Sequence, residues 1–397
     1  MRRLLPLLSL VLALPAVAES NLSISGKVGL EARYFPQDAS FPGQHGSTAL
    51  SGIIEPEFQW SDESQNNLFS FVPFLRLDQR DSERTHADIR ELSWIHVGDD
   101  WELRSGIRTV FWGVTEFQHL VDIINQTDAV EAIDAEEKLG QPMVNLSLVK
   151  DWGIIDLFVL PGFRERTFPG VDGRFRGGLV VDTDLAEYES AAEEKHVDLA
   201  LRWSHTFDVY DIGLYWFRGT SRDPQLRPVT RPSGETILSP FYPQITQYGL
   251  DLQATIESWL WKLEAIRRDS KSEEYWAAQA GFEYTLVGVS DSAVDLGLLM
   301  EYGWDERDDP GLTTFQNDLF VGTRITLNDA ASTEFLAGAG YDLDTQSKSF
   351  LVEASRRFGD NWKVSLDAGI FSSDDPTDVA HSIRNDDYVK LQAEYFF

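Results

Sequence analysis

Apolar and polar residues alternate along most of this chain with a period of two. The pattern is plain in NLSISGKVGLEARYF (residues 21–35) and recurs in HVDLALRWSH (196–205), AVDLGLLMEYGW (293–304) and WKVSLDAGIF (362–371). Such alternation predicts β-strands with one apolar face. The strands of ordinary globular domains have about 5–6 residues, whereas a tilted strand needs about 9–11 to cross a bilayer. The alternating segments here reach that second length, which favours membrane-crossing strands.

The links between these segments also follow a pattern. We count eighteen candidate strands, which start near residues 21, 48, 67, 85, 101, 143, 154, 195, 210, 246, 259, 274, 292, 314, 332, 348, 361 and 386. Links after even-numbered strands are short, and long links follow odd-numbered strands at 36–47, 113–142, 164–194, 219–245 and 373–385. Outer-membrane barrels sort their connections in this way. The fold class predicted is all-β: a single closed antiparallel transmembrane β-barrel of about 18 strands. Sixteen stays open, because residues 85–98 and 143–163 alternate poorly.

Tryptophan positions support the same interpretation. With these eighteen strands, the tryptophans fall into two groups. One group lies near the short links, at Trp60, Trp101, Trp152, Trp203, Trp259 and Trp362. The other lies near the long links, at Trp112, Trp216, Trp276 and Trp304. Two aromatic belts are expected where a barrel meets the two membrane interfaces. The alternative is a soluble β-sandwich with scattered aromatic residues, which would bury its apolar face inside.

The first residues and the composition of the chain predict where the protein is located in the cell. Residues 1–18 combine a basic start, an apolar run and an Ala-Val-Ala site, which predicts a cleaved signal peptide. Residues 19–397 are then the barrel, in the outer membrane of a Gram-negative bacterium, among its lipid and lipopolysaccharide. The formal net charge of −31 argues against binding nucleic acid. The chain has no cysteine, so disulfides do not stabilise it.

The last ten residues, YVKLQAEYFF, carry a resemblance to a known family. They alternate and end on an aromatic residue, as in Gram-negative outer-membrane β-barrels of the porin-like superfamily. The resemblance implies that the strand ending in Tyr395 and Phe397 is recognised by the barrel-insertion machinery. A second, shorter likeness is to alginate-export-type porins, through RSGIRTVFWGVTEF (104–117) and DIINQTD (122–128).

The face opposite the apolar one meets the lumen, and its charges are mixed with an acidic excess. The long link at 113–142 carries seven acids against one lysine. We expect it to fold inward after the fifth strand and to set acids opposite Arg104 and Arg108, which would create a transverse field. An outward lid is the alternative. The residues expected to line the lumen or its constriction are Arg104, Arg108, Glu116, His119, Asp122, Asn125, Asp128, Glu55 and Glu57.

These features predict a porin-like channel for diffusion or selective transport of small solutes, with a mild preference for cations and neutral solutes. One alternative is an exporter or importer of a polymer or hydrophobic compound, which would need a lateral opening or a bound partner. A lipid-acting enzyme is less favoured. His196 and Asp198 share the lumen face without an evident nucleophile, and no hydrolase motif occurs, so we expect no enzymatic activity. The acidic stretches 305–310 and 372–378 lack the spacing of a calcium loop. No metal or cofactor is expected.

Overall fold

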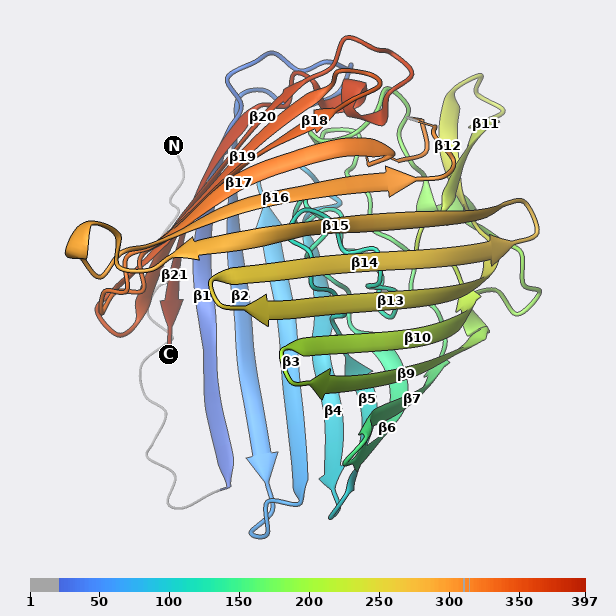
Figure 1. Cartoon of the computed structure of the whole chain (residues 1–397). Helices are drawn as coiled ribbons and strands as arrows, with labels where there is room; N and C mark the ends of the chain where they lie inside the picture. The colour runs from blue at the N-terminus through green and yellow to red at the C-terminus, as the bar shows by residue number, and fades with distance from the viewer. Residues whose placement is uncertain (1–20, 310, 314) are drawn as a thin grey trace, which may run out of the picture.

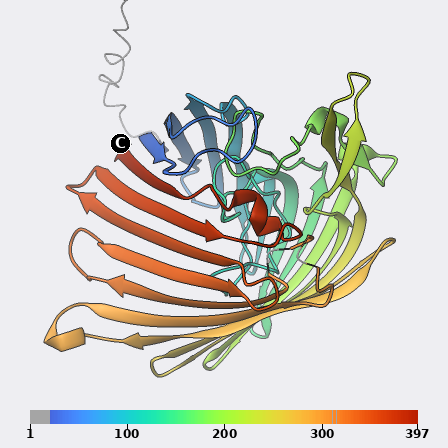
Figure 2. The same ribbon diagram turned by 90° about the horizontal axis from the view of Figure 1, so that it is seen from above.

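The computed structural model describes residues 21–309, 311–313 and 315–397, and the predicted signal peptide lies outside this part of the chain. Within it, eighteen strands form one closed ring (Figures 1 and 2). They are β1 (Leu22–Tyr34), β2 (Thr48–Ser61), β3 (Asn67–Asp78), β4 (His86–Val97), β5 (Trp101–Arg108), β6 (Gln141–Lys150), β7 (Gly153–Pro161), β9 (Val197–Phe207), β10 (Tyr210–Thr220), β13 (Gln244–Ile256), β14 (Trp259–Ser270), β15 (Glu274–Leu286), β16 (Asp295–Asp305), β17 (Asn317–Thr326), β18 (Glu334–Asp342), β19 (Lys348–Phe358), β20 (Trp362–Ser372) and β21 (Tyr388–Phe396). Each begins within three residues of its expected start.

Every barrel strand pairs antiparallel with its neighbours in chain order, and β21 closes the ring against β1. The closing register runs from Lys27 opposite Phe396 to Tyr34 opposite Val389. Beyond it, the amide and carbonyl of Gly26 bond those of Phe397 at 3.1 and 3.0 Å. Closure leaves neither β1 nor β21 as an open end of the sheet, which hydrocarbon requires. The predicted closed antiparallel barrel is confirmed, with eighteen strands rather than sixteen.

The outer face of the ring is apolar, as the alternation predicts. On β21, Val389 and Leu391 are 42% and 50% exposed outward, whereas Lys390 between them forms an ion pair with Asp367 at 3.3 Å. None of the helices among the described residues is long and apolar enough to cross a membrane.

Long links gather at one end of the barrel and short turns at the other. The long-loop end carries a second, three-stranded sheet of β8 (Glu187–Tyr188), β11 (Gln225–Thr230) and β12 (Thr236–Tyr242) (Figure 1). The described residues also form four short 3₁₀ helices: η1 (Thr183–Leu185), η2 (Glu193–Lys195), η3 (Val289–Asp291) and η4 (Val379–Ile383).

The stretch that alternates poorly near residue 90 contains a β-bulge. Val72 of β3 pairs with Glu91 of β4, but the next residue, Pro73, pairs with Ile89, so Arg90 is an extra residue. One inserted residue moves every following side chain to the opposite face. This shift explains why residues 85–98 alternate poorly in the sequence.

Candidate functional site

The link between β5 and β6 (residues 109–140), which we call the inner loop, folds into the barrel. Its first part contacts lumen-facing side chains of β14 and β16, and its second part contacts β1, β3 and β4. The loop can be followed inside the ring of strands in Figure 2. Contacts with walls this far apart in the strand order place the loop within the lumen.

Two buried carboxylates hold the backbone at the start of the inner loop. Glu264 of β14 has no exposed surface and accepts three backbone hydrogen bonds. The donors are the amides of Val114 (2.7 Å), Thr115 (3.1 Å) and Val121 (3.1 Å). Glu301 of β16 accepts from the amides of Glu116 at 2.8 Å and Phe117 at 3.2 Å. An irregular loop has unpaired amides, and these carboxylates satisfy them with charge-assisted bonds.

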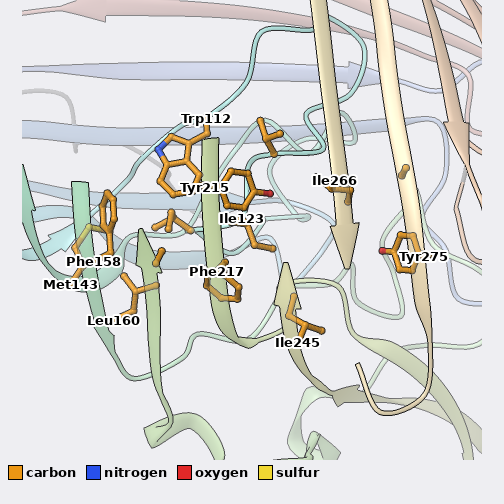
Figure 3. Close-up of a cluster of buried hydrophobic side chains, with 14 residues drawn as sticks. Trp112, Ile123, Met143, Phe158, Leu160, Tyr215, Phe217, Ile245, Ile266 and Tyr275 are labelled. Carbon is orange, nitrogen blue, oxygen red and sulfur yellow. The ribbon is translucent and has the colours of Figure 1, made fainter. Parts of the chain in front are cut away.

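An apolar cluster attaches the same part of the loop to the wall (Figure 3). Trp112 is 7% exposed, and its ring centroid lies 5.0 Å from Tyr215 and 5.7 Å from Phe158. The cluster also contains Val121, Ile123 and Ile124 of the loop with Met143, Leu160, Ala200, Phe217, Ile245, Ile266, Tyr275 and Ala277 of the wall. Each fully buried side chain of this kind contributes roughly 1.5–3 kcal/mol.

This cluster corrects one expectation and explains another. Trp112 was expected in an aromatic belt, but it points into the lumen because the loop turns inward directly after β5. Residues 143–163 alternate poorly because part of their lumen face is apolar too. Met143, Phe158 and Leu160 pack beneath the inner loop rather than facing water.

Arginines of the opposite wall hold the second part of the inner loop. The guanidinium of Arg76 on β3 donates to both oxygens of Glu131, at 2.7 and 2.5 Å. Arg33 of β1 donates to the Glu131 carbonyl at 2.8 Å, and Arg84 donates to the carbonyl of Val130 at 2.9 Å. Glu131 is only 6% exposed. A buried charge pair of this geometry fixes position strongly, because removing either partner leaves the other uncompensated.

Asp128 forms the neighbouring contact. Arg90 of β4 lies 2.8 Å from its carboxylate, and the Nε2 atom of His86 lies 3.4 Å away. Burial opposes ionisation, but the hydrogen bond from His86 and the charge of Arg90 outweigh it and lower the pKa of Asp128 to about 2. His86, Asp128 and Glu131 bring three potential metal-ligand atoms within 4.8 Å. Arginines already pair with both carboxylates, so the arrangement is that of an ion-pair network.

The loop residues predicted from the sequence all have partners. Asn125 is 1% exposed and donates to the carbonyls of Arg108 and Leu139, which ties the two ends of the loop together. The other contacts are Glu116 with Arg324 (2.6 Å) and Lys262 (3.5 Å), Asp122 with Lys138 (3.1 Å), and the ring of His119 against Phe111 (4.8 Å between centroids).

The expected pairing of these acids with Arg104 and Arg108 is wrong. Arg104 bonds Asn145 and Ser147 of β6 at 2.9 and 2.8 Å, and it also contacts Glu102. The inner loop leaves β5 at Arg108 and reaches β14 within a few residues, so its acids pass beyond the β5 wall. They meet basic residues of β3, β4, β14 and β17 instead.

Glu55 and Glu57 lie on β2, away from the anchors of the loop. The carboxylate of Glu55 is 3.6 Å from the Lys27 ammonium, and Glu57 accepts a hydrogen bond from Gln59 at 2.5 Å. The first contact joins β1 and β2, and the second lies within β2.

A group of acids stays exposed in the lumen. Asp134, Glu136 and Glu137 of the inner loop are exposed, and Glu353 of β19 and Asp367 of β20 interact electrostatically with Asp134 from the facing wall. Although Glu136 contacts water, the enclosing wall and the charges of Asp134 and Glu353 raise its pKa to about 7. We call these five residues the acidic cluster.

Sequence reasoning missed the roles of several of these residues. The alternation places Glu264 and Glu301 on the lumen face without giving them a partner, and it gives no position in the lumen to the acids at 134–137. Alternation gives the face of a residue but not its height in the barrel or its neighbour across the lumen. The apolar residues around Trp112 were the available signal that the loop needs a buried partner: Val110, Phe111, Val114 and Phe117.

His196 and Asp198 contact each other at 2.7 Å. The carboxylate of Asp198 has no exposed surface, and it also pairs with Arg222 at 2.7 Å and accepts the Thr220 amide at 3.0 Å. These contacts attach β9 to the end of β10 and to the link that follows it, at the long-loop end of the barrel.

Solved structures share this architecture across nearly the whole chain. A BenF-like porin from Pseudomonas fluorescens aligns with a TM-score of 0.55 and 8% identity over 95% of this chain and 97% of that chain. OccD3 (OpdP) of Pseudomonas aeruginosa aligns with a TM-score of 0.52 and 10% identity over 94% and 91%. The chain has a porin-like β-barrel fold.

A third similar structure is the barrel Wzi of Escherichia coli, a carbohydrate-binding protein involved in group 1 capsule assembly. It aligns with a TM-score of 0.53 and 8% identity over 92% of this chain and 83% of that chain. No protein family and no curated protein matches the chain in sequence. At identities this low the porin-like likeness concerns the fold, so solute preference has to be argued from the residues of the lumen.

Proposed function

We propose that this protein is an outer-membrane channel for small solutes, in which the inner loop narrows the lumen and the acidic cluster favours cations and neutral solutes. A barrel of this strand number is wide enough to hold water unless something fills it. The inner loop occupies part of that width and is attached to both sides. The porin-like fold of the solved neighbours supports a channel rather than a closed structural barrel.

The observation that carries the proposal is the imbalance of free charge. The basic residues that meet the loop, Arg76, Arg90 and Arg324 among them, are each paired with a carboxylate. In contrast, Asp134, Glu136 and Glu137 project into the lumen. Clustered carboxylates between low-dielectric walls focus a negative potential, which attracts cations and repels small anions.

Reversal potentials across a planar bilayer test this proposal. Purified protein is reconstituted in a bilayer under a KCl gradient at pH 8. We expect a stable conductance whose reversal potential is shifted from zero toward the equilibrium potential of K⁺. The triple variant D134N/E136Q/E137Q should shift the reversal potential toward zero. The matched control neutralises three exposed acids of the short turns, E63Q/D99N/D208N, and should leave it near the wild-type value.

Three results would refute the proposal. Absence of ion conduction would exclude a channel. Anion selectivity of the wild type would contradict the role of the acids. Equal shifts in the triple variant and its control would show that bulk charge rather than the acidic cluster sets selectivity.

A further inference from the structure

The barrel wall has a notch where β5 ends. This strand is the shortest of those that form the ring, with eight residues, and its pairing with β4 stops at Leu92 opposite Ile107. β4 continues beyond Leu92 to His86 and pairs with β3 on its other side, down to Arg76 opposite His86. The edge of β4 at residues 86–91 therefore has no strand partner toward β5.

An open cavity of about 350 Å³ lies at this notch. Its apolar lining comes from Ala87 and Ile89 of β4, Ile107 of β5 and Pro142 of β6. These side chains are on the outward face, since their sequence neighbours Asp88, Arg90, Arg108 and Gln141 belong to the inner face. The apolar side of the cavity therefore faces outward, and Asp88 and Arg164 line it from the inner side.

The outward side chains next to the cavity are apolar. Ala87 pairs with Leu75 of β3, and Leu75 pairs with Ile54 of β2. The side chains of Leu75 and Ile54 are 38% and 48% exposed on the outer face. Leu92 of β4, beyond Ile89 on the same outer face, is 47% exposed. The notch therefore lies beside outward apolar side chains of both β3 and β4, which are the kind that face hydrocarbon in a membrane barrel.

The floor of the cavity is charged. Arg164, from the link after β7, pairs with Asp88 at 2.8 Å and donates to the carbonyl of Gly140 at 2.8 Å. Asp88 is shared, because Arg90 also lies 3.0 Å from it. The Arg164 side chain remains 32% exposed. A guanidinium has five N–H donors, so these two contacts leave donors on the exposed side for a further acceptor.

We propose that this notch binds an anionic single-chain amphiphile from the membrane, a fatty-acid-type carboxylate, with its acyl chain against Ile89, Ile107 and Pro142 and its carboxylate on Arg164. The volume lies at the low end of the roughly 300–1,000 Å³ of small-molecule sites, which suits one chain rather than a lipid with several. Arginine binds carboxylates with paired hydrogen bonds, and a low-dielectric setting strengthens them.

Photolabelling tests the site directly. Protein in nanodiscs is incubated with palmitic acid carrying a diazirine near its tail, irradiated and mapped by mass spectrometry. We expect labels on the segments around Ile89, Ile107 and Pro142. Ile107→Trp fills the cavity and should abolish these labels, whereas the control Ile54→Trp, on the outer face but outside the notch, should retain them. Both variants are checked for the heat-resistant folded form on gels.

The headgroup is tested separately. Arg164→Gln should weaken labelling by the acid about tenfold, because it removes the charged partner of the carboxylate. Labelling by the uncharged methyl ester should be weak in wild type and unchanged in this variant. Labels spread evenly over outward-facing strands, or equal labelling by acid and ester, would overturn the proposal. Reversal potentials of the same variants should equal wild type, so failure here leaves the channel proposal intact.

Discussion

The contact between Glu264 and the inner loop offers the sharpest test of how the lumen is built. Glu264→Ala removes the acceptor of three loop amides without touching the loop sequence. We expect residues 112–121 to detach from the β14 wall while the barrel stays folded, because the strand ladders on both sides of β14 remain.

The size of the effect follows from the donors left behind. Thr115 and Val121 are buried, with 4% and 0% exposure, whereas Val114 is half-buried and can bond water. Each buried donor without a partner costs about 1–3 kcal/mol, which gives about 2–6 kcal/mol. Removing a buried charge offsets part of this sum, since its desolvation opposes folding. The low end, about 2 kcal/mol, raises the detached population roughly thirtyfold.

Hydrogen exchange and single-channel recording measure that change. The amides of Thr115 and Val121 should exchange roughly thirtyfold faster in Glu264→Ala, and open-channel current should become larger or noisier. Glu264→Gln keeps one acceptor oxygen and should fall between wild type and Glu264→Ala. The matched control is Glu334→Ala, which removes a carboxylate that contacts Ser355 on the wall.

Unchanged exchange at Thr115 and Val121 in Glu264→Ala would refute the reasoning, because it would mean that the apolar cluster alone fixes the loop. Equal effects of Glu334→Ala would point to charge loss in the lumen as the cause. Global unfolding would show as faster exchange in β14 itself and is therefore distinguishable from local detachment.

Three further outcomes are expected. Lowering the pH from 8 to 5.5 should reduce cation selectivity with a midpoint near 7, since the raised pKa of Glu136 leaves it uncharged at the acid end, and Glu136→Gln should remove this dependence in reversal-potential measurements. Gly249→Ala should lower the temperature at which the barrel loses its heat-resistant gel mobility, because the added Cβ would lie 1.9 Å from the ring of Tyr215. Deletion of Phe397, whose backbone bonds Gly26, should reduce the yield of assembled barrel in membrane fractions, since it removes the last contacts of the closing seam.

The barrel could be predicted from the sequence because each strand separates two solvents. A side chain on β21 such as Leu391 faces lipid and its neighbour Lys390 faces the lumen, so every residue reports its own environment. The alternation of apolar and polar residues was misleading where a strand does not separate lipid from water in this regular way. The extra residue Arg90 shifts the frame of β4, and Phe158 on β7 is apolar toward the lumen because the inner loop covers it.

The interior site was less predictable, because its contacts cross the lumen between residues far apart in the chain. The inward direction of the loop was expected from its length and charge, but the partners assigned were the nearest basic residues in sequence, Arg104 and Arg108. The actual partner of Glu131 is Arg76, and that of Glu116 is Arg324. Periodicity carries no information on which strands face each other across a ring of eighteen.

The anchors and the free acids of the inner loop respond to pH in different ranges. Asp128 has a depressed pKa near 2, so its contribution to holding the loop is fully present above the ordinary pKa of an aspartate, about 3.9, and is lost only as the pH falls toward 2. Glu136 has a raised pKa near 7, so its ionisation between about 4.5 and 7 opposes the folded arrangement. Between pH 8 and 5.5 the Asp128 anchor therefore keeps its charge while the acidic cluster loses charge. Acidification in this range should change which ions pass while leaving the width set by the loop, so conductance at saturating salt should stay nearly constant as selectivity falls.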